Sequence, residues 1–366
     1  MQYILLRPQP EKGLIVGIVN KSKPNLILFN LETSSESKVL AAGIDWIKSL
    51  SILSQNVYVF STHIGLFTLP NNVKVFELGG GNFKNRFKWF MNNFYAIYLV
   101  FKLKKSVVIF HHMSHYSVIF PGIIFRLIGV RQGLWYAHAH KSFSLFLAAR
   151  IANNLFTSAP GAFPVKSKKI SYLGQGVKIE DFQNAFKSDK NFHRTGIVSV
   201  GRISPAKNLE ILLNSVPFNF ASKIEFLGGI ENLGYHTNLA ALAEKKNLTL
   251  TFNYAKTYSE IPNYLVKWRY YFCGTDVAVD KAVIEAAAAG CIVISLNKNV
   301  LELTGMNEVY QKLKVPIPNE LEAQIDTFEN LTDLQRYEIQ LVISNLTGEM
   351  NNVYTTTGKI FNKLTS

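Results

Sequence analysis

The chain has 366 residues, of which 48% are hydrophobic and 17% are charged, so it can bury a large core and is not intrinsically disordered. Its net charge is +14, from 39 Lys and Arg against 25 Asp and Glu, which favours anionic partners. No segment carries the roughly 18 uncharged apolar residues of a membrane-spanning helix, and the first residues do not resemble a signal peptide. We therefore expect a cytoplasmic protein.

Strands and helices alternate from residue 25 onward. Short apolar runs predict strands at 25–30, 57–62, 73–78, 107–112, 133–139, 155–159 and 169–174. Helical spacing of apolar residues is found between them, over 38–53, 84–105 and 118–130. Nearly continuous apolar strands that alternate with helices are typical of a parallel sheet covered on both faces.

A polar segment, 176–196, follows and is interpreted as a linker. A second strand–helix series begins after it, with strands expected at 196–201, 223–229, 248–253, 270–274 and 291–295. The tail, 318–364, has a mostly helical pattern. The chain is therefore expected to contain an N-terminal extension, two α/β domains and a C-terminal helix near the first domain, with bounds 1–24, 25–185, 186–345 and 346–366.

The segment 198–216 places two cations where a helix is expected to begin. Ser204 suits the N-cap and Pro205 the first helical position, so Arg202 and Lys207 would lie at the helix start. Cations there oppose the helix dipole by about 0.3–1 kcal/mol each. Because free backbone N–H groups at a helix start also favour phosphate, the pattern predicts an anion site.

A later helix carries a single acid in an apolar setting. Asp280 can cap a helix that begins at Lys281, and Gly290 can end it. Between residues 282 and 294 the only charged residue is Glu285, which is costly to bury unless it accepts hydrogen bonds. Ribose hydroxyls could donate them. The alternatives are backbone N–H donors and a side chain turned to solvent.

These two segments resemble a known family. GRISPAKNLEILLNSV is similar to the signature G-R-x-x-x-x-K-[NG], and DKAVIEAAAAGCIVIS to the E-x7-E region, of the retaining nucleotide-sugar glycosyltransferases of group 1, family 4 type. ISYLGQGVKIEDF resembles the linker of that family. The resemblance implies the α/β GT-B fold. In that fold two Rossmann-like parallel-sheet domains face each other across a cleft, and the C-terminal helices return toward the first domain.

The resemblance also implies roles for individual residues. Arg202 and Lys207 would bind the donor diphosphate and stabilise the leaving group. Glu285 would accept hydrogen bonds from the ribose, and Gly201 would let the backbone approach the ligand. Further contacts with the donor are expected from Asp276, Lys281 and Val283.

One position departs from the family. The first Glu of E-x7-E should fall at 277, where this chain has Val277, and Asp280 stands where the family commonly has Gly. We expect Asp280 to substitute in part for the missing acid near the reacting carbon. The departure leaves the identity of the sugar open.

Histidines gather where two predicted strands end. Five of the eight lie between 111 and 140, and carboxyl ends of strands are where ligands bind in such folds. The resemblance places a His there opposite the donor sugar, and His112 and His138 are the candidates, followed by His111. A neutral imidazole could bond sugar or acceptor hydroxyls. Core histidines and a metal site are the alternatives, and we expect no metal and no cofactor.

The segment 79–105 mixes basic and aromatic side chains. One interpretation is a peripheral face for an anionic membrane on the cytoplasmic side, which would suit a lipid-linked acceptor. The other is a buried helix with solvated basic ends. No known nucleic-acid-binding module is recognisable, so no nucleic-acid partner is expected.

The resemblance implies a hexosyltransferase that moves a sugar, with retention, from a UDP-, GDP- or ADP-linked donor to a glycan or lipid-linked acceptor in cell-surface polysaccharide synthesis. Two alternatives stay open. The first is a catalytically silent, glycosyltransferase-like binding subunit, which the absence of the first Glu favours. The second is a nucleotide-sugar epimerase of the same fold.

Overall fold

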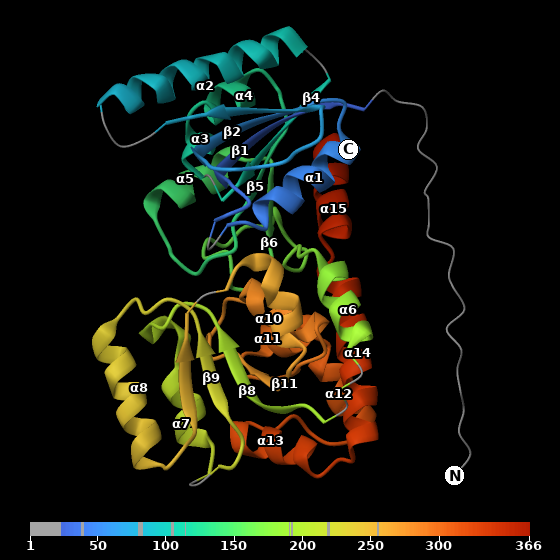
Figure 1. Ribbon diagram of the computed structural model, residues 1–366. Coiled ribbons are helices and arrows are strands. Elements are labelled where there is room, and N and C mark those ends of the chain that lie inside the picture. The colour runs from blue at the N-terminus through green and yellow to red at the C-terminus, as the bar shows by residue number, and fades with distance from the viewer. Residues whose placement is uncertain are drawn as a thin grey trace, which may run out of the picture.

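The computed structural model describes residues 23–37, 40–79, 83–103, 106–113, 115–189, 191, 193–217, 220–254 and 256–366. It contains two parallel sheets, one above the other in Figure 1. Most of the expected N-terminal extension, 1–24, lies outside the described residues.

The first sheet has seven strands in the order β3-β2-β1-β4-β5-β6-β7, all paired in parallel. Its strands are β1 (Asn25–Thr33), β2 (Val57–Ile64), β3 (Val73–Glu77), β4 (Val107–His112), β5 (Gln132–Trp135), β6 (Asn154–Thr157) and β7 (Ile170–Tyr172). Its helices are α1 (Gly43–Leu53), α2 (Phe83–Leu103), α3 (His115–Ile119), α4 (Gly122–Leu127) and α5 (Phe143–Ile151).

The central strand β1 shows why the strands of this sheet are apolar without interruption. Leu26 and Leu28 pack into a core with α1 and the C-terminal helix α15 (Val353–Thr365). Ile27 and Phe29, on the other face, pack into a separate core with α2. Both faces of the strand are therefore buried, as expected of a parallel sheet between helices.

The second sheet has five parallel strands in the order β10-β9-β8-β11-β12. They are β8 (Thr195–Val200), β9 (Ile224–Leu227), β10 (Leu250–Asn253), β11 (Trp268–Phe272) and β12 (Ile292–Ile294). The helices and 3-10 turns around it are η1 (Pro205–Lys207), α7 (Leu209–Ser215), α8 (Leu233–Lys245), η2 (Tyr258–Glu260), α9 (Ile261–Leu265), α10 (Lys281–Ala288), α11 (Lys298–Leu303), α12 (Met306–Leu313), α13 (Leu321–Glu329) and α14 (Asp333–Asn351).

The polar segment interpreted as a linker contains a helix, α6 (Ile179–Ser188). Its buried side chains, Ile179, Phe182 and Phe186, belong to the core of the second sheet. At the end of the chain, α14 leads into α15, which runs back along α1 and the first sheet (Figure 1). We therefore propose that the second domain begins before α6 rather than at residue 186.

The carboxyl ends of the two sheets lead into loops that touch. Asn299 on α11, after β12, donates hydrogen bonds from Nδ2 to the carbonyl oxygens of Pro160 at 2.8 Å and Val277 at 3.0 Å. Gln175, which follows β7, donates from its side-chain amide to the carbonyl of Val279. Pro160 follows β6 and Val277 follows β11, so the carboxyl-terminal edges of the two sheets, where such folds bind ligands, face each other.

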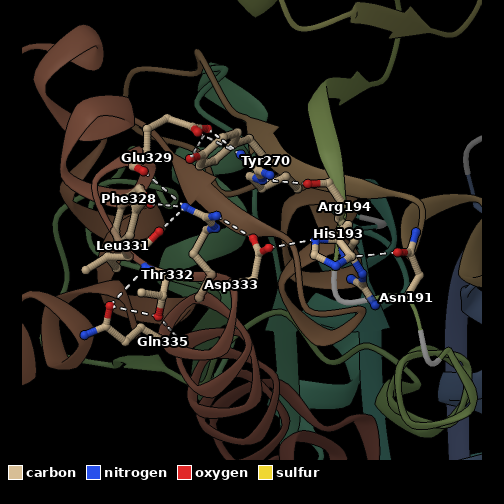
Figure 2. Close-up of polar contacts among 12 residues, drawn as sticks. Asn191, His193, Arg194, Tyr270, Phe328, Glu329, Leu331, Thr332, Asp333 and Gln335 are labelled. Carbon is tan, nitrogen blue, oxygen red and sulfur yellow. Dashed lines mark hydrogen bonds and ion pairs between the residues drawn. The ribbon is translucent and has the colours of Figure 1, made fainter.

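The opposite, amino-terminal edge of the second sheet is tied to α13 and α14 by polar contacts (Figure 2). Glu329 accepts hydrogen bonds from Arg269 and Tyr270, each at 2.8 Å. Asp333 lies 2.7 Å from Nδ1 of His193, just before β8. These contacts fasten the strand starts to the C-terminal helices.

Candidate functional site

The backbone after β8 differs from the predicted helix start. Residues 205–207 form the single 3-10 turn η1, and α7 begins only at Leu209. Within the described chain the Ser204 hydroxyl makes no capping hydrogen bond. Ser204 and Pro205 do start a helical turn, as predicted, but the prediction that they start the α-helix itself is wrong.

Asn208 causes the break between η1 and α7. Its φ of +47° lies in the left-handed region, where a helix cannot continue. Its side-chain amide donates to the Gly274 carbonyl at 2.8 Å and to Oδ1 of Asp276 at 3.1 Å. A contact with the loop after β11 thus holds the turn that carries Lys207.

Both predicted phosphate-binding cations are paired with carboxylates. Nη1 of Arg202 lies 2.6 Å from Oε1 of Glu231, and Nζ of Lys207 lies 2.5 Å from Oδ2 of Asp280. The second pair joins the two segments singled out from the sequence, which are 73 residues apart. Glu231, in the Gly-rich loop after β9, was not among the residues predicted from the sequence.

Two glycines allow the loops after β8 and β9 to pack directly against each other. At Gly201 the φ is +150°, and a Cβ would lie 3.2 Å from Cε of Lys207. A Cβ at Gly228 would lie 1.9 Å from the carbonyl oxygen of Gly201. No larger residue fits at Gly228 without moving the Arg202 loop.

Glu285 is buried on α10, with 7% of its surface exposed. Its Oε1 accepts a hydrogen bond from the Tyr258 hydroxyl at 3.0 Å. Burial raises the pKa of the Glu285 carboxyl from 4.5 to about 7. Of the other candidates on α10, Val283 is fully buried, backbone included, and so does not contact the space in which a ligand would bind.

The start of α10 also faces the first domain. Asp280 occupies the N-cap position by its backbone, but its carboxylate binds Lys207 instead of capping the helix. Burial lowers the pKa of Lys281, while the charges of Glu285 and of Asp45 on α1 raise it. Lys281 therefore lies in a charged junction between the two domains.

His112 lies at the end of β4, near this junction. Its Nδ1 is 3.0 Å from Oδ1 of Asn30, and its ring centroid is 4.7 Å from that of Trp46. Burial, with a smaller contribution from the charge of Lys281, lowers the pKa of His112 to about 3. The imidazole is therefore neutral at neutral pH and can exchange hydrogen bonds as a neutral group.

The other histidines differ in their surroundings. His111 has partners for both ring nitrogens, Oγ of Ser117 at 2.7 Å and Oε1 of Gln132 at 3.1 Å, so it acts as a core side chain. His138 is exposed, and its Nδ1 accepts from the backbone N–H of His140. In the part of the chain described, no three His, Cys, Asp or Glu side chains form a group that could hold a metal ion.

Val277, which stands in place of the first Glu, contacts the first domain. A Cβ at Gly161 would lie 2.6 Å from Cγ1 of Val277. The neighbouring Asp276 is exposed and accepts from Asn208. The position of the missing acid is thus an apolar contact between the loops of the two sheets.

No family model and no curated protein matches the chain. Solved structures do. HepE from Anabaena, in complex with UDP, is 15% identical with a TM-score of 0.67, covering 93% of this chain and 99% of that protein. Sucrose-phosphate synthase from Thermosynechococcus elongatus is 13% identical with a TM-score of 0.68 and the same coverage. A glycosyltransferase from Rickettsia africae is 14% identical with a TM-score of 0.67, covering 94% and 99%.

These likenesses extend over nearly the whole chain, and they agree with two parallel sheets whose carboxyl ends meet. The expected fold class is confirmed: the chain has the GT-B fold.

Proposed function

We propose that the protein is a retaining hexosyltransferase that takes its sugar from a nucleotide-diphosphate donor. The observation that carries the proposal is the ion pair between Lys207 and Asp280, because it brings the two motif segments together at the carboxyl edge of the second sheet. Arg202 and Lys207 would bind the diphosphate, and Glu285 would accept the ribose hydroxyls.

Donor binding in this proposal begins with an exchange of anions. The diphosphate takes the place of Asp280 at Lys207 and of Glu231 at Arg202, since a phosphate carries more charge than a carboxylate. Asp280, once released, can approach the sugar, where the family has an acid that Val277 does not supply. His112, as a neutral imidazole beside Lys281, would contact the sugar or acceptor hydroxyls, together with the exposed His138.

The solved structures support a UDP-sugar as the first donor to test. HepE structures hold UDP and UDP-glucose. A glycan or lipid-linked acceptor on the side of the first domain, and a role in cell-surface polysaccharide synthesis, complete the proposal.

A nucleotide-sugar panel tests it. The protein is incubated with UDP-, GDP- and ADP-sugars, and stabilisation against thermal unfolding and release of free nucleotide are measured. At least one donor is expected to raise the melting temperature, and Arg202→Ala and Lys207→Ala should each abolish most of the shift. The control is Lys245→Ala, an exposed lysine on α8 of the same domain. Equal shifts in parent and both variants would contradict the phosphate site.

A catalytically silent binding subunit is the second candidate, favoured by the apolar contact of Val277 with Gly161. The same panel separates the two. A donor that binds tightly, with no hydrolysis or transfer on any acceptor, would support the silent subunit.

We also propose that α2 lies on an anionic membrane surface on the cytoplasmic side. In Figure 1 α2 lies on the outer side of the first sheet, away from the second sheet. Among the described residues no helix has both the length and the apolarity of a membrane span. A peripheral contact is instead supported by exposed apolar side chains along α2, which are Phe87, Phe90, Met91, Phe94, Tyr98 and Phe101. Lys102 on the same helix and Arg126 on the neighbouring α4 add positive charge.

Cosedimentation with vesicles tests this contact. More protein is expected to bind phosphatidylglycerol vesicles than phosphatidylcholine vesicles, and Phe90→Ser/Phe94→Ser should remove most of the binding. Ile52→Ser, at an exposed apolar residue of α1, serves as the control. Binding that survives the double substitution would refute a role for α2.

A further inference from the structure

A hollow on one face of the second sheet lies apart from the proposed donor site. It has a volume of about 550 Å³ and reaches from the amino ends of β8 and β11 to the carboxyl end of β10. Its lining includes neither Arg202, Lys207 nor Glu285. It contains three lysines, and we call it the lysine hollow after Lys223, Lys256 and Lys267.

A buried carboxylate forms the floor of the lysine hollow. Glu225 on β9 is 2% exposed and lies 2.6 Å from Nζ of Lys223. It also accepts hydrogen bonds from the hydroxyls of Thr251, at 3.3 Å, and Tyr264. Because a buried carboxylate must keep such partners, Glu225 holds Lys223 and Tyr264 in place.

Aromatic rings position two of the three ammonium groups. Nζ of Lys223 lies 5.4 Å from the ring centroid of Trp268, and Nζ of Lys256 lies 5.1 Å from that of Tyr264. Both distances suit cation–π contacts. Trp268 is buried, and the Tyr264 hydroxyl is hydrogen-bonded to Glu225. Both ammonium groups therefore contact aromatic rings whose positions are fixed by the surrounding structure.

The charge of the lysine hollow is only partly compensated. Glu225 is the one acid among its lining residues and is paired with Lys223. The Lys267 ammonium group has no hydrogen-bond or ion-pair partner within the part of the chain that is described. The Lys256 ammonium group contacts the Tyr264 ring, and its charge also helps to lower the pKa of the exposed Glu260 carboxyl. Among the described residues neither of these two ammonium groups is ion-paired with a carboxylate, so the positive charge at the hollow favours an anion.

We propose that the lysine hollow binds an anionic saccharide, a sugar that carries a phosphate or carboxylate group. Lysine ammonium groups bind such anions as point charges. The side chains of Thr195 and Asn253, at opposite ends of the hollow, can exchange hydrogen bonds with sugar hydroxyls. The volume of the hollow is in the range of pockets that bind small molecules such as a sugar. The site is independent of the proposed donor site and of the proposed transfer reaction.

Calorimetric titration of the full chain tests the proposal, with glucose 6-phosphate and oligogalacturonate as the two anionic probes and glucose as the neutral one. At least one anionic probe should bind and glucose should not. The double variant Lys256→Gln/Lys267→Gln should weaken binding about tenfold or more, and binding should fall as salt is raised. The probe that binds distinguishes a phosphorylated sugar from an acidic glycan.

Two controls keep this site distinct from the donor site. Lys245→Gln, at an exposed lysine of the same domain, and Lys207→Ala should both leave the binding of the anionic probe unchanged. The double variant should in turn bind nucleotides as the parent does. The proposal is overturned if neither anionic probe binds, if the double variant binds as the parent does, or if Lys207→Ala removes the binding.

Discussion

At the carboxyl end of β8, the side chains of Arg202 and Lys207 are each paired with a carboxylate. On the face of the same sheet, the Lys256 ammonium contacts an aromatic ring, and the Lys267 ammonium has no hydrogen-bonding or ionic partner within the described chain. Arg202 and Lys207 lie on the segment that follows β8, and their acidic partners come from other loops. In the lysine hollow the single acid, Glu225, belongs to a strand.

The two groups of cations differ in what an incoming ligand would have to displace. An anion that enters the lysine hollow would meet two ammonium groups that are not ion-paired in the described chain, so its affinity should depend on salt and on the number of lysines. A diphosphate at Arg202 and Lys207 must first replace two carboxylates carried by loops, one of which is tied to the other domain through the Val279 carbonyl. The proposed donor site is thus suited to coupling ligand binding with loop movement, and the lysine hollow to ligand binding without loop movement.

The largest expected effect comes from a substitution that should disrupt the proposed donor site and leave the lysine hollow intact. Gly228→Ala forces a Cβ against the Gly201 carbonyl and should lower the free energy of unfolding by about 3 kcal/mol, as overpacking does. Chemical denaturation measures the loss. Nucleotide binding should disappear in the folded variant, while binding in the lysine hollow should persist.

Gly229→Ala is the matched control, because no atom lies within 4 Å of a Cβ at that position. Equal stability of the two variants would show that the approach of the loops after β8 and β9 does not hold the Arg202 turn.

A smaller effect on stability, which depends on pH, is expected from the buried acids of the two regions. Glu225 has an ammonium and two hydroxyls as partners, whereas Glu285 has a tyrosine hydroxyl. The pKa of Glu285 is about 7 when folded, against an ordinary 4.5, so the folded protein binds more protons between these values. The stability of the protein should therefore fall as the pH rises from about 4.5 to 7, by about 2.5 kcal/mol from this group.

Glu285→Gln should remove that loss, because the amide stays neutral at every pH. Denaturation at pH 5 and pH 8 measures it, with Glu244→Gln on the exposed side of α8 as the control. A variant whose stability falls between these two pH values as much as that of the parent would assign the pH dependence to other groups.

The sequence predicts the sheets well because both faces of their strands are buried. In β1, alternate side chains enter two different cores, so an uninterrupted apolar run identifies the strand. The helix α6 was missed, since its segment is polar overall. Its signal was present, in Ile179, Phe182 and Phe186, which recur at helical spacing.

The candidate site is predictable in its residues but not in its contacts. The signature indicates Arg202 and Lys207, yet their partners Glu231 and Asp280 are 29 and 73 residues away, and only the fold brings them together. The left-handed Asn208 is likewise stabilised by a contact with Gly274. Local propensity favoured a helix from Pro205 onward, and this tertiary contact overrides it.

The smallest expected effect concerns the carboxylate of Asp280, the group by which the donor region differs most from the lysine hollow. If Asp280 competes with phosphate for Lys207, then Asp280→Asn leaves the ammonium without a full counter-charge and should tighten UDP binding about fivefold, or roughly 1 kcal/mol. Calorimetric titration measures the change, with Asp326→Asn, at an exposed acid of α13, as the control. Transfer or hydrolysis of the UDP-sugar should slow in the same variant, because the proposed function also requires the released carboxylate at the sugar. Weaker binding of UDP would mean that Asp280 supports the nucleotide instead of competing with it. The nucleotide would then not displace Asp280 from Lys207, and this contrast with the lysine hollow would be lost.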